Sequence, residues 1–265
     1  NSVDAGVVEE DIENATQVQL AVSEENEVII KTPSAIDRSV QPEIGPDPEV
    51  TLPEVWKEKT TNGIDVWGIK HAEVPLVRYS LVINGGHLLE SPEKAGVSSF
   101  LASMLMEGTA TKTPEELEEA IDLLGVSIYI SGGTENITIN VNTLARNFEK
   151  TVELVEEILL EPRWDAEQFE LVKSRILNEL KRNEANPAYL ASQQFSKLIY
   201  GENSILGIPS SGTIESVESI TMDDLKAFYA ENFSPTVTEM QVAGDIDRTQ
   251  VLTALSSLSA GWEAK

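Results

Sequence analysis

The side chains that could bind a metal or transfer a proton are few in this sequence. Its 265 residues include two histidines, His71 and His87, and no cysteine. Without cysteine the chain has no disulfide, no thiolate nucleophile and no cysteine-ligated zinc. A metal or acid-base site in this sequence must therefore combine these histidines with carboxylates.

Neither histidine lies in a recognisable catalytic motif. His71 follows a predicted strand and His87 follows a pair of glycines, so we expect both to be exposed loop residues. The glycine pairs at 85–86 and 132–133 lack the spacing of phosphate-binding loops, and residues 210–212 lack the GxSxG frame of a serine nucleophile. These segments are predicted to be turns and a surface loop.

One stretch has the spacing of a metallopeptidase helix. Residues 96–109 read GVSSFLASMLMEGT, which resembles the signature G-L-A-H-F-L-E-H-M-L-F-x-G-T of the insulinase and pitrilysin zinc peptidases, a family that includes the mitochondrial processing peptidases. In this HxxEH motif, the inverzincin arrangement, two histidines bind zinc and the glutamate acts as general base. The resemblance places these three roles on Ser99, Ala102 and Ser103, so the catalytic positions are degenerate.

The resemblance also implies a third zinc ligand, a glutamate on a later helix. It falls on Glu179, 76 residues after Ser103. At about 100° per residue, Glu179 lies about 20° from Val172 and about 60° from Ile176, so we expect an inward-pointing carboxylate. We interpret Glu179 as a relic ligand. Because one carboxylate and two hydroxyls make a poor zinc site, we expect no metal in this chain and zinc in a catalytic domain of the parent or partner protein.

Hydrophobic periodicity and turn signals predict the elements that position these residues. The predicted strands cover 56–61, 64–69, 77–84, 126–131, 137–143 and 238–243, with a type I′ turn at Asn62-Gly63. The predicted helices cover 92–108, 113–125, 147–160, 165–183, 188–200, 221–231 and 248–259. Hairpins mixed with helices predict an α+β fold, in which a mainly antiparallel sheet of about five to six strands packs against helices. The resemblance implies a processing-peptidase-like fold.

Composition divides the chain into two parts. Residues 1–54 carry 13 acids against two bases and five prolines from Pro33 to Pro53, so we predict an acidic tail and interdomain linker there. Residues 55–265 are predicted to be an inactive insulinase-type peptidase domain. The sequence starts without methionine, a targeting segment or an apolar run of membrane-spanning length, and we expect a fragment of a longer protein.

The net charge of -26, from 45 acids and 19 bases, excludes a nucleic-acid partner, because phosphate binding depends on clustered lysine and arginine. The acids of 115–119 are expected on a solvated helix face opposite Leu117. The resemblance implies a substrate chamber enclosed by two halves of the protein, and other acids are expected to line it and to favour cationic peptides.

The resemblance implies an inactive copy of a repeated domain, most similar to the third domain of long four-domain bacterial zinc proteases. We expect a non-catalytic structural or substrate-chamber domain of a zinc metalloendopeptidase, whose partners are a catalytic HxxEH-bearing domain or subunit and the peptide substrate. One alternative is a scaffold that stabilises a partner half without contacting substrate. Another is a substitute peptidase site around His87, Glu90 and Glu179. The family resemblance suggests a periplasmic or cell-envelope location in a Gram-negative bacterium.

Overall fold

The structure of the chain, a computed structural model, describes residues 39, 41, 45, 47 and 53–264. The compact unit Thr51–Lys265 contains every helix and strand of the described residues. Most of the predicted tail and linker over 1–54 lies outside them, so that division of the chain stays a prediction.

One six-stranded sheet carries the fold. Its strands are β1 (Val55–Lys59), β2 (Asp65–Lys70), β3 (Leu76–Asn84), β4 (Ser127–Gly132), β5 (Asn136–Leu144) and β6 (Thr238–Gly244). They are ordered β1-β2-β6-β3-β5-β4. Strands β2 and β6 run parallel, and all other neighbours run antiparallel. The predicted α+β class and mainly antiparallel sheet are confirmed.

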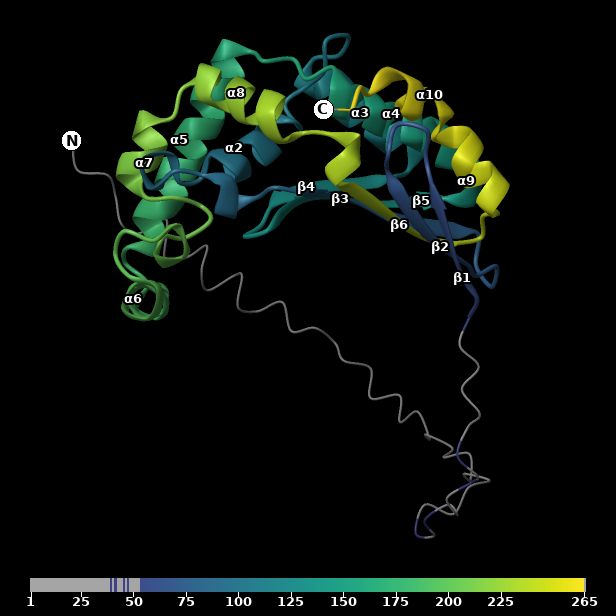
Figure 1. Cartoon of the computed structure of the whole chain (residues 1–265), viewed down its shortest axis with the longest axis horizontal. Helices are drawn as coiled ribbons and strands as arrows, with labels where there is room; N and C mark the ends of the chain where they lie inside the picture. The colour runs from purple at the N-terminus through teal and green to yellow at the C-terminus, as the bar shows by residue number, and fades with distance from the viewer. Residues whose placement is uncertain (1–38, 40, 42–44, 46, 48–52, 265) are drawn as a thin grey trace, which may run out of the picture. The chain divides into compact units, whose positions relative to one another are not determined.

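The helices lie mostly over one face of this sheet, apart from the helix at 187–200, which lies to one side of it (Figure 1). They are α2 (Val97–Met104), α3 (Pro114–Leu124), α4 (Phe148–Leu160), α5 (Ala166–Asn183), α6 (Pro187–Tyr200), α7 (Ile214–Ser219), α8 (Met222–Asn232), α9 (Arg248–Ala254) and α10 (Ser256–Gly261). Short 3-10 turns join them: η1 (His87–Leu89), η2 (Pro92–Lys94), η3 (Ala145–Asn147), η4 (Ile205–Gly207) and η5 (Pro235–Val237). In the described part of the chain, no helix is both long enough and apolar enough to cross a bilayer.

The hydrophobic core lies between the sheet and these helices. Alternate residues of the central strands, such as Leu81 and Ile139, are fully buried beneath the helical layer. On the helical side, the Phe100 ring of α2 stacks on the Phe169 ring of α5 with 4.9 Å between ring centroids. This stacking holds α2 between α5 and the sheet, and α2 carries the degenerate motif.

Among the described residues no helix covers the other face of the sheet, which we call the open face, and most of its strand residues are uncharged. Cross-strand hydrogen bonds there join Ser80 Oγ to Asn140 Oδ1 at 2.8 Å and Arg78 Nε to Asn142 Oδ1 at 2.6 Å. Among the strand residues of this face the acids are Asp65 and Glu239, and the bases are Lys57, Lys59 and Arg78. The predicted acidic lining is therefore wrong for this face. The acids of 115–119 are exposed on α3, as predicted.

The helix predicted over 92–108 is shorter in the structure. It is divided into η2 and α2 by Gly96, whose φ of 98° lies in the left-handed region that interrupts a right-handed helix. The helix predicted over 248–259 is likewise divided into α9 and α10 at Leu255, whose ψ of -3° departs from helical geometry.

The β1–β2 hairpin forms as predicted, but its turn is not type I′. A type I′ turn requires positive φ at both central residues, and of Asn62 and Gly63 only Gly63 has it, with φ 110°. The Asn62 amide instead donates to the carbonyl oxygens of Leu258 at 3.4 Å and Trp262 at 3.1 Å. Tertiary contacts of this side chain with α10 thus replace the local turn preference.

Candidate functional site

The three motif positions lie on α2, and the structure uses all three for internal contacts. The Ser99 hydroxyl donates to the carbonyl oxygen of Ser210 at 2.8 Å, and the Ser103 hydroxyl donates back to the carbonyl oxygen of Ser99 at 3.2 Å. Ala102 is 1% exposed and belongs to the core. These residues do not fit a zinc ion. Two hydroxyl groups that already donate to carbonyl oxygens stand in place of the two histidine ligands, and a methyl group stands in place of the general base.

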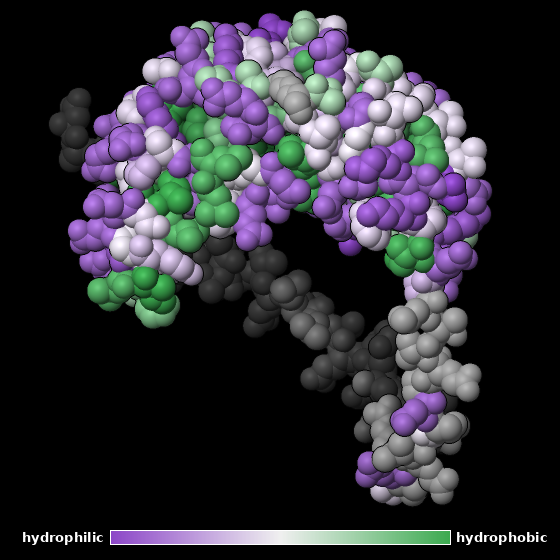
Figure 2. Space-filling view, in the orientation of Figure 1, coloured by the Kyte–Doolittle hydropathy of each residue, from purple (hydrophilic) through white to green (hydrophobic). Residues whose placement is uncertain are grey.

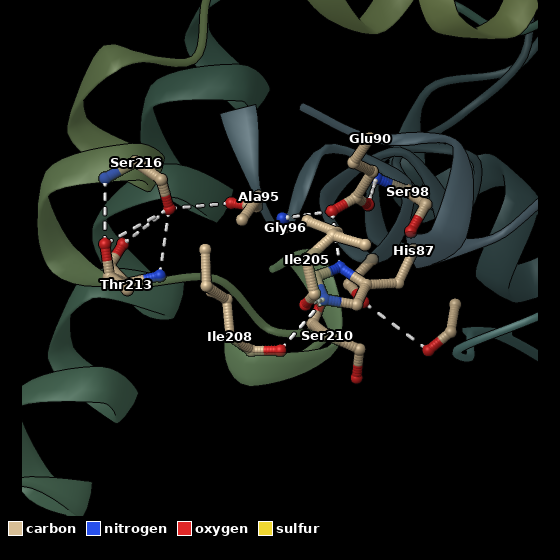
Figure 3. Close-up of polar contacts among 12 residues, drawn as sticks. His87, Glu90, Ala95, Gly96, Ser98, Ile205, Ile208, Ser210, Thr213 and Ser216 are labelled. Atoms are coloured by element: carbon tan, nitrogen blue, oxygen red, sulfur yellow. Dashed lines mark hydrogen bonds and ion pairs between the residues drawn. The ribbon is translucent and has the colours of Figure 1, made fainter. Parts of the chain in front are cut away.

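The beginning of α2 is held by Glu90. Its carboxylate accepts hydrogen bonds from the backbone amides of Gly96 at 2.7 Å and Ser98 at 2.8 Å (Figure 3). The first amides of a helix have no partner within the helix and carry partial positive charge, so a carboxylate there satisfies both requirements. Glu90 thereby acts as a capping group supplied from outside the helix.

The same carboxylate also contacts the side chain of His87. Its Nδ1 lies 2.7 Å from Glu90 Oε2, and its Nε2 lies 2.8 Å and 2.9 Å from the carbonyl oxygens of Ile205 and Ile208 (Figure 3). Because both ring nitrogens face acceptors, the doubly protonated imidazolium satisfies every contact. Burial of the ring lowers the pKa of His87, but the hydrogen bonds to Glu90 and the two carbonyls outweigh it and leave the pKa raised.

The prediction of an exposed loop histidine is wrong for His87, which is 2% exposed. It is confirmed for His71, whose side chain is 58% exposed and lies 3.6 Å from Glu73. The difference arises because residues 205–208, far along the chain, cover His87 and supply its acceptors. No local signal in the sequence reports that contact.

Glu179 is exposed on α5, so the prediction of an inward carboxylate is wrong. The buried stripe of this helix includes Phe169, Val172 and Leu180. At about 100° per residue around the helix axis, Glu179 lies about 80° from Phe169 and about 100° from Leu180. Val172, at the edge of the buried stripe, is the buried residue closest to it in angle. Its interpretation as a relic ligand rests on sequence spacing and stays a prediction.

The substitute site around His87, Glu90 and Glu179 does not form. The first two residues are buried together and occupied by each other and by backbone groups, whereas Glu179 is in solvent. Across residues 53–264, no three histidine, aspartate or glutamate side chains come together as metal ligands. The buried pair therefore joins α2 to the 205–208 segment rather than forming a reactive centre.

A contact that sequence reasoning missed lies beside this pair. The Ser216 hydroxyl of α7 donates to the carbonyl oxygen of Ala95 at 2.7 Å, just before α2 begins (Figure 3). The signal that could have revealed α7 is the spacing of Thr213 and Ser216, whose side chains and backbone amides form a reciprocal capping box. Segments 90–98 and 205–216 are thus tied together at several points.

Fold and site together define an α+β domain in which a six-stranded sheet packs against helices and Ser99, Ala102 and Ser103 make internal contacts. The chain belongs to the insulinase family, peptidase family M16, whose sequence model matches residues 68–206. It is 26% identical over 182 residues to an uncharacterized zinc protease of Mycobacterium leprae, which covers 68% of this chain and 41% of that protein. It is 25% identical over 184 residues to a non-peptidase homolog, YmxG, of Helicobacter pylori, covering 69% of this chain and 42% of that protein.

Solved structures share the fold. The peptidase M16 inactive domain from Pseudomonas fluorescens has a TM-score of 0.75 at 23% identity, covering 80% of this chain and 52% of that chain. The periplasmic protease PqqL from Escherichia coli has a TM-score of 0.72 at 18% identity, covering 82% of this chain and 25% of that chain. The chain thus spans about half the length, or less, of the relatives it matches.

Proposed function

We propose that this chain is a non-catalytic domain of a zinc metalloendopeptidase. The observation that carries the proposal is the state of α2, where Ser99 and Ser103 donate to backbone carbonyls and Ala102 is in the core. None of the three can bind zinc as an imidazole does or take a proton from water as a carboxylate does. In this proposal, zinc and hydrolysis belong to a partner domain with an intact HxxEH motif.

The length of the relatives supports a partner of similar size. This chain corresponds to 41% of the Mycobacterium leprae zinc protease and to 25% of the Escherichia coli protease chain. Both fractions are consistent with one domain of a two-domain or four-domain protein. A place as the third domain of a four-domain protein remains our proposal.

The open face of the sheet supports a role in contacting peptide. It presents amide and hydroxyl side chains on the central strands, such as Asn140, Asn142 and Ser80, which can hydrogen-bond any peptide without selecting its sequence. In the proposed assembly this face forms part of the chamber wall. The chain then positions substrate, while the partner domain performs the chemistry.

A second candidate function is scaffolding, and α6 favours it. None of the 14 residues of α6 is buried. Three of them, Phe195, Leu198 and Ile199, are large apolar side chains that are 63%, 84% and 56% exposed. Figure 2 shows hydrophobic side chains gathered on the surface at the place of α6 in Figure 1. Contiguous exposed apolar side chains mark protein contacts, so α6 is suited to pack against the partner half.

Metal analysis and peptide hydrolysis test the proposal. We expect the purified 265-residue chain to carry no stoichiometric zinc and to hydrolyse no peptide. Addition of an HxxEH-bearing half from a family member should produce hydrolysis that exceeds the activity of that half alone. About one zinc per chain, or hydrolysis by this chain alone, would contradict the proposal.

Two variants separate the chamber role from scaffolding. Trp67→Ala on the open face should raise KM for peptide and leave complex formation unchanged if this face contacts substrate. Leu198→Glu on α6 should weaken complex formation and leave the KM of the assembled complex unchanged. If Trp67→Ala leaves the KM unchanged and the variant still activates the HxxEH-bearing half, the scaffolding role is favoured over the chamber role.

A further inference from the structure

A groove with apolar walls crosses the open face of the sheet. It consists of two hollows of about 450 Å³ and 610 Å³, which share the residues Ile69, Arg78 and Ala243 at their junction. Val55 and Trp67 line the hollow on one side of this junction. Val74 and Leu76, both about half exposed, line the hollow on the other side.

Arg78 lies at the junction without an acidic partner. No carboxylate of the described residues comes within 4.0 Å of its guanidinium. Glu239 also lines the groove, but it is four residues along β6 from Ala243, the strand partner of Arg78, which is about 13 Å at strand spacing. Among the described residues Arg78 is therefore a cation that lines both hollows and has no ion-pair partner.

The hydrogen bonds of Arg78 leave its outer nitrogens available. Its Nε donates to Asn142 Oδ1 at 2.6 Å, which fixes the orientation of the guanidinium against the sheet. The two terminal nitrogens can then form the paired hydrogen bonds by which arginine recognises a carboxylate. Trp67 forms an aromatic wall of one hollow, and Lys57 Nζ, which does not line the hollows, lies 4.1 Å from the centroid of its ring.

We propose that this groove binds an extended peptide segment in which an aspartate or glutamate is flanked on both sides by apolar residues. The carboxylate pairs with Arg78, and the flanking side chains occupy the two hollows. Because the groove continues on both sides of Arg78, its geometry fits an internal acidic side chain better than a chain end. The inference rests on the proposed substrate contact and replaces the preference for cationic peptides expected from the net charge.

Binding of blocked peptides to the full chain tests this assignment. Acetylated and amidated peptides with the sequence Val-Val-Asp-Leu-Leu, and the same sequence with asparagine, are titrated by calorimetry. The change in tryptophan fluorescence that is lost in Trp67→Phe is a second readout. We expect the aspartate peptide to bind about tenfold more tightly than the asparagine peptide, as one charge-assisted pair supports. Arg78→Gln should remove this difference, and Arg78→Lys should retain part of it because the charge remains without the planar fork.

Arg182→Gln is the matched control, because it removes the same charge from an exposed position on α5. Equal affinity for the two blocked peptides, or an unchanged preference in Arg78→Gln, would overturn the inference. So would tighter binding of an unblocked asparagine peptide than of the blocked aspartate peptide, which would assign Arg78 to a terminal carboxylate. Since Arg78 is exposed, its variants should keep the wild-type circular dichroism spectrum.

The same experiment distinguishes this inference from the proposed function. If the blocked peptides show no preference while the chain still activates an HxxEH-bearing half, the groove assignment fails and the proposed function stands. If peptide binding depends on Arg78 but no catalytic half is activated, the proposed function fails and the groove assignment stands.

Discussion

The buried pair His87–Glu90 is the central polar contact around α2. Each carboxylate oxygen of Glu90 accepts a backbone amide of the helix start, and one of them also faces the imidazole. The imidazole in turn contacts two carbonyls of the 205–208 segment. Loss of one member leaves the other buried without its partner, which is costly in a medium of low dielectric constant.

We therefore predict that stability depends on the protonation of His87. Its pKa is raised in the folded state above the unfolded value near 6.5, so its contribution is fully present below about pH 6.5 and is lost as the pH rises through the folded-state pKa. At pH 6, His87→Gln should lower the free energy of unfolding by about 2 kcal/mol. That deficit should shrink as the pH rises, as measured by urea unfolding between pH 6 and pH 9.

His71→Gln is the control, because His71 is exposed. Its unfolding free energy should stay parallel to that of the wild type across the same range. A deficit of His87→Gln that is constant with pH would mean that the buried ring is neutral in the folded state.

Single residues also show how far the sequence could predict the site. The signature spacing placed Ser99, Ala102 and Ser103 on one helix, because helical neighbours are set by local geometry. The burial of His87 could not be predicted, since its acceptors at Ile205 and Ile208 follow 118 and 121 residues later. The direction of Glu179 was predicted from Val172 and Ile176, whereas Phe169 and Leu180 on the far side of the buried stripe lie about 80° and 100° from it.

At the scale of elements, α2 and β4 pack closely through a glycine. An added Cβ at Gly132, the last residue of β4, would lie 2.7 Å from Ser99 Cα and 2.8 Å from Ser99 N. These are backbone atoms of a helix that Glu90 and the Ser99 hydroxyl already hold in place. The missing side chain therefore sets the distance between the helix and the sheet.

We predict that Gly132→Ala destabilises the domain by about 1 to 3 kcal/mol, the usual cost of overpacking. In a domain of this size, the melting temperature should fall by roughly 2 to 4 °C for each kcal/mol lost. Thermal unfolding followed by circular dichroism measures the change. Gly261→Ala is the matched control, because its added Cβ would meet only side-chain atoms at 3.5 Å; equal melting temperatures for the two variants would refute the close contact.

Elements with strong local signals formed as predicted. Thr113 caps α3 through a capping box with Glu116, and Ile137, Ile139 and Val141 alternate into the core from β5. Elements that depend on distant contacts were predicted less well. The six-residue helix α7 is too short for periodicity to reveal, and its serine contacts a carbonyl 121 residues earlier.

For the whole molecule, the distribution of charge matters more than its sum. The net charge of -26 suggested an acidic lining for a chamber, yet the strand residues of the open face include only two acids, Asp65 and Glu239. On the open sheet face, Lys57 and Arg78 have no acidic partner within 4.0 Å among the described residues, and Lys59 pairs with Asp65 at 3.2 Å. The net charge and the local potential of a surface can thus differ in sign.

We predict that α6 is the main surface for association with a catalytic half. Leu198→Glu places a charge where an apolar side chain is 84% exposed, and it should weaken that association at least tenfold by desolvating the carboxylate. Leu123→Glu on α3, where leucine is 80% exposed, is the matched control and should bind like the wild type. Affinities measured by calorimetry with an HxxEH-bearing half test this; equal weakening by both variants would indicate general charge repulsion instead.

The position of β6 has a consequence for how the chain acquires its fold. This strand is the last in sequence, yet it lies between β2 and β3 and pairs with both. Without β6, the β1–β2 hairpin and the three strands β3, β5 and β4 have no strand pairing with each other, and the edges of β2 and β3 that β6 occupies are unpaired. Residues 238–244 join them, so a chain that ends before Thr238 lacks the strand that connects its two halves.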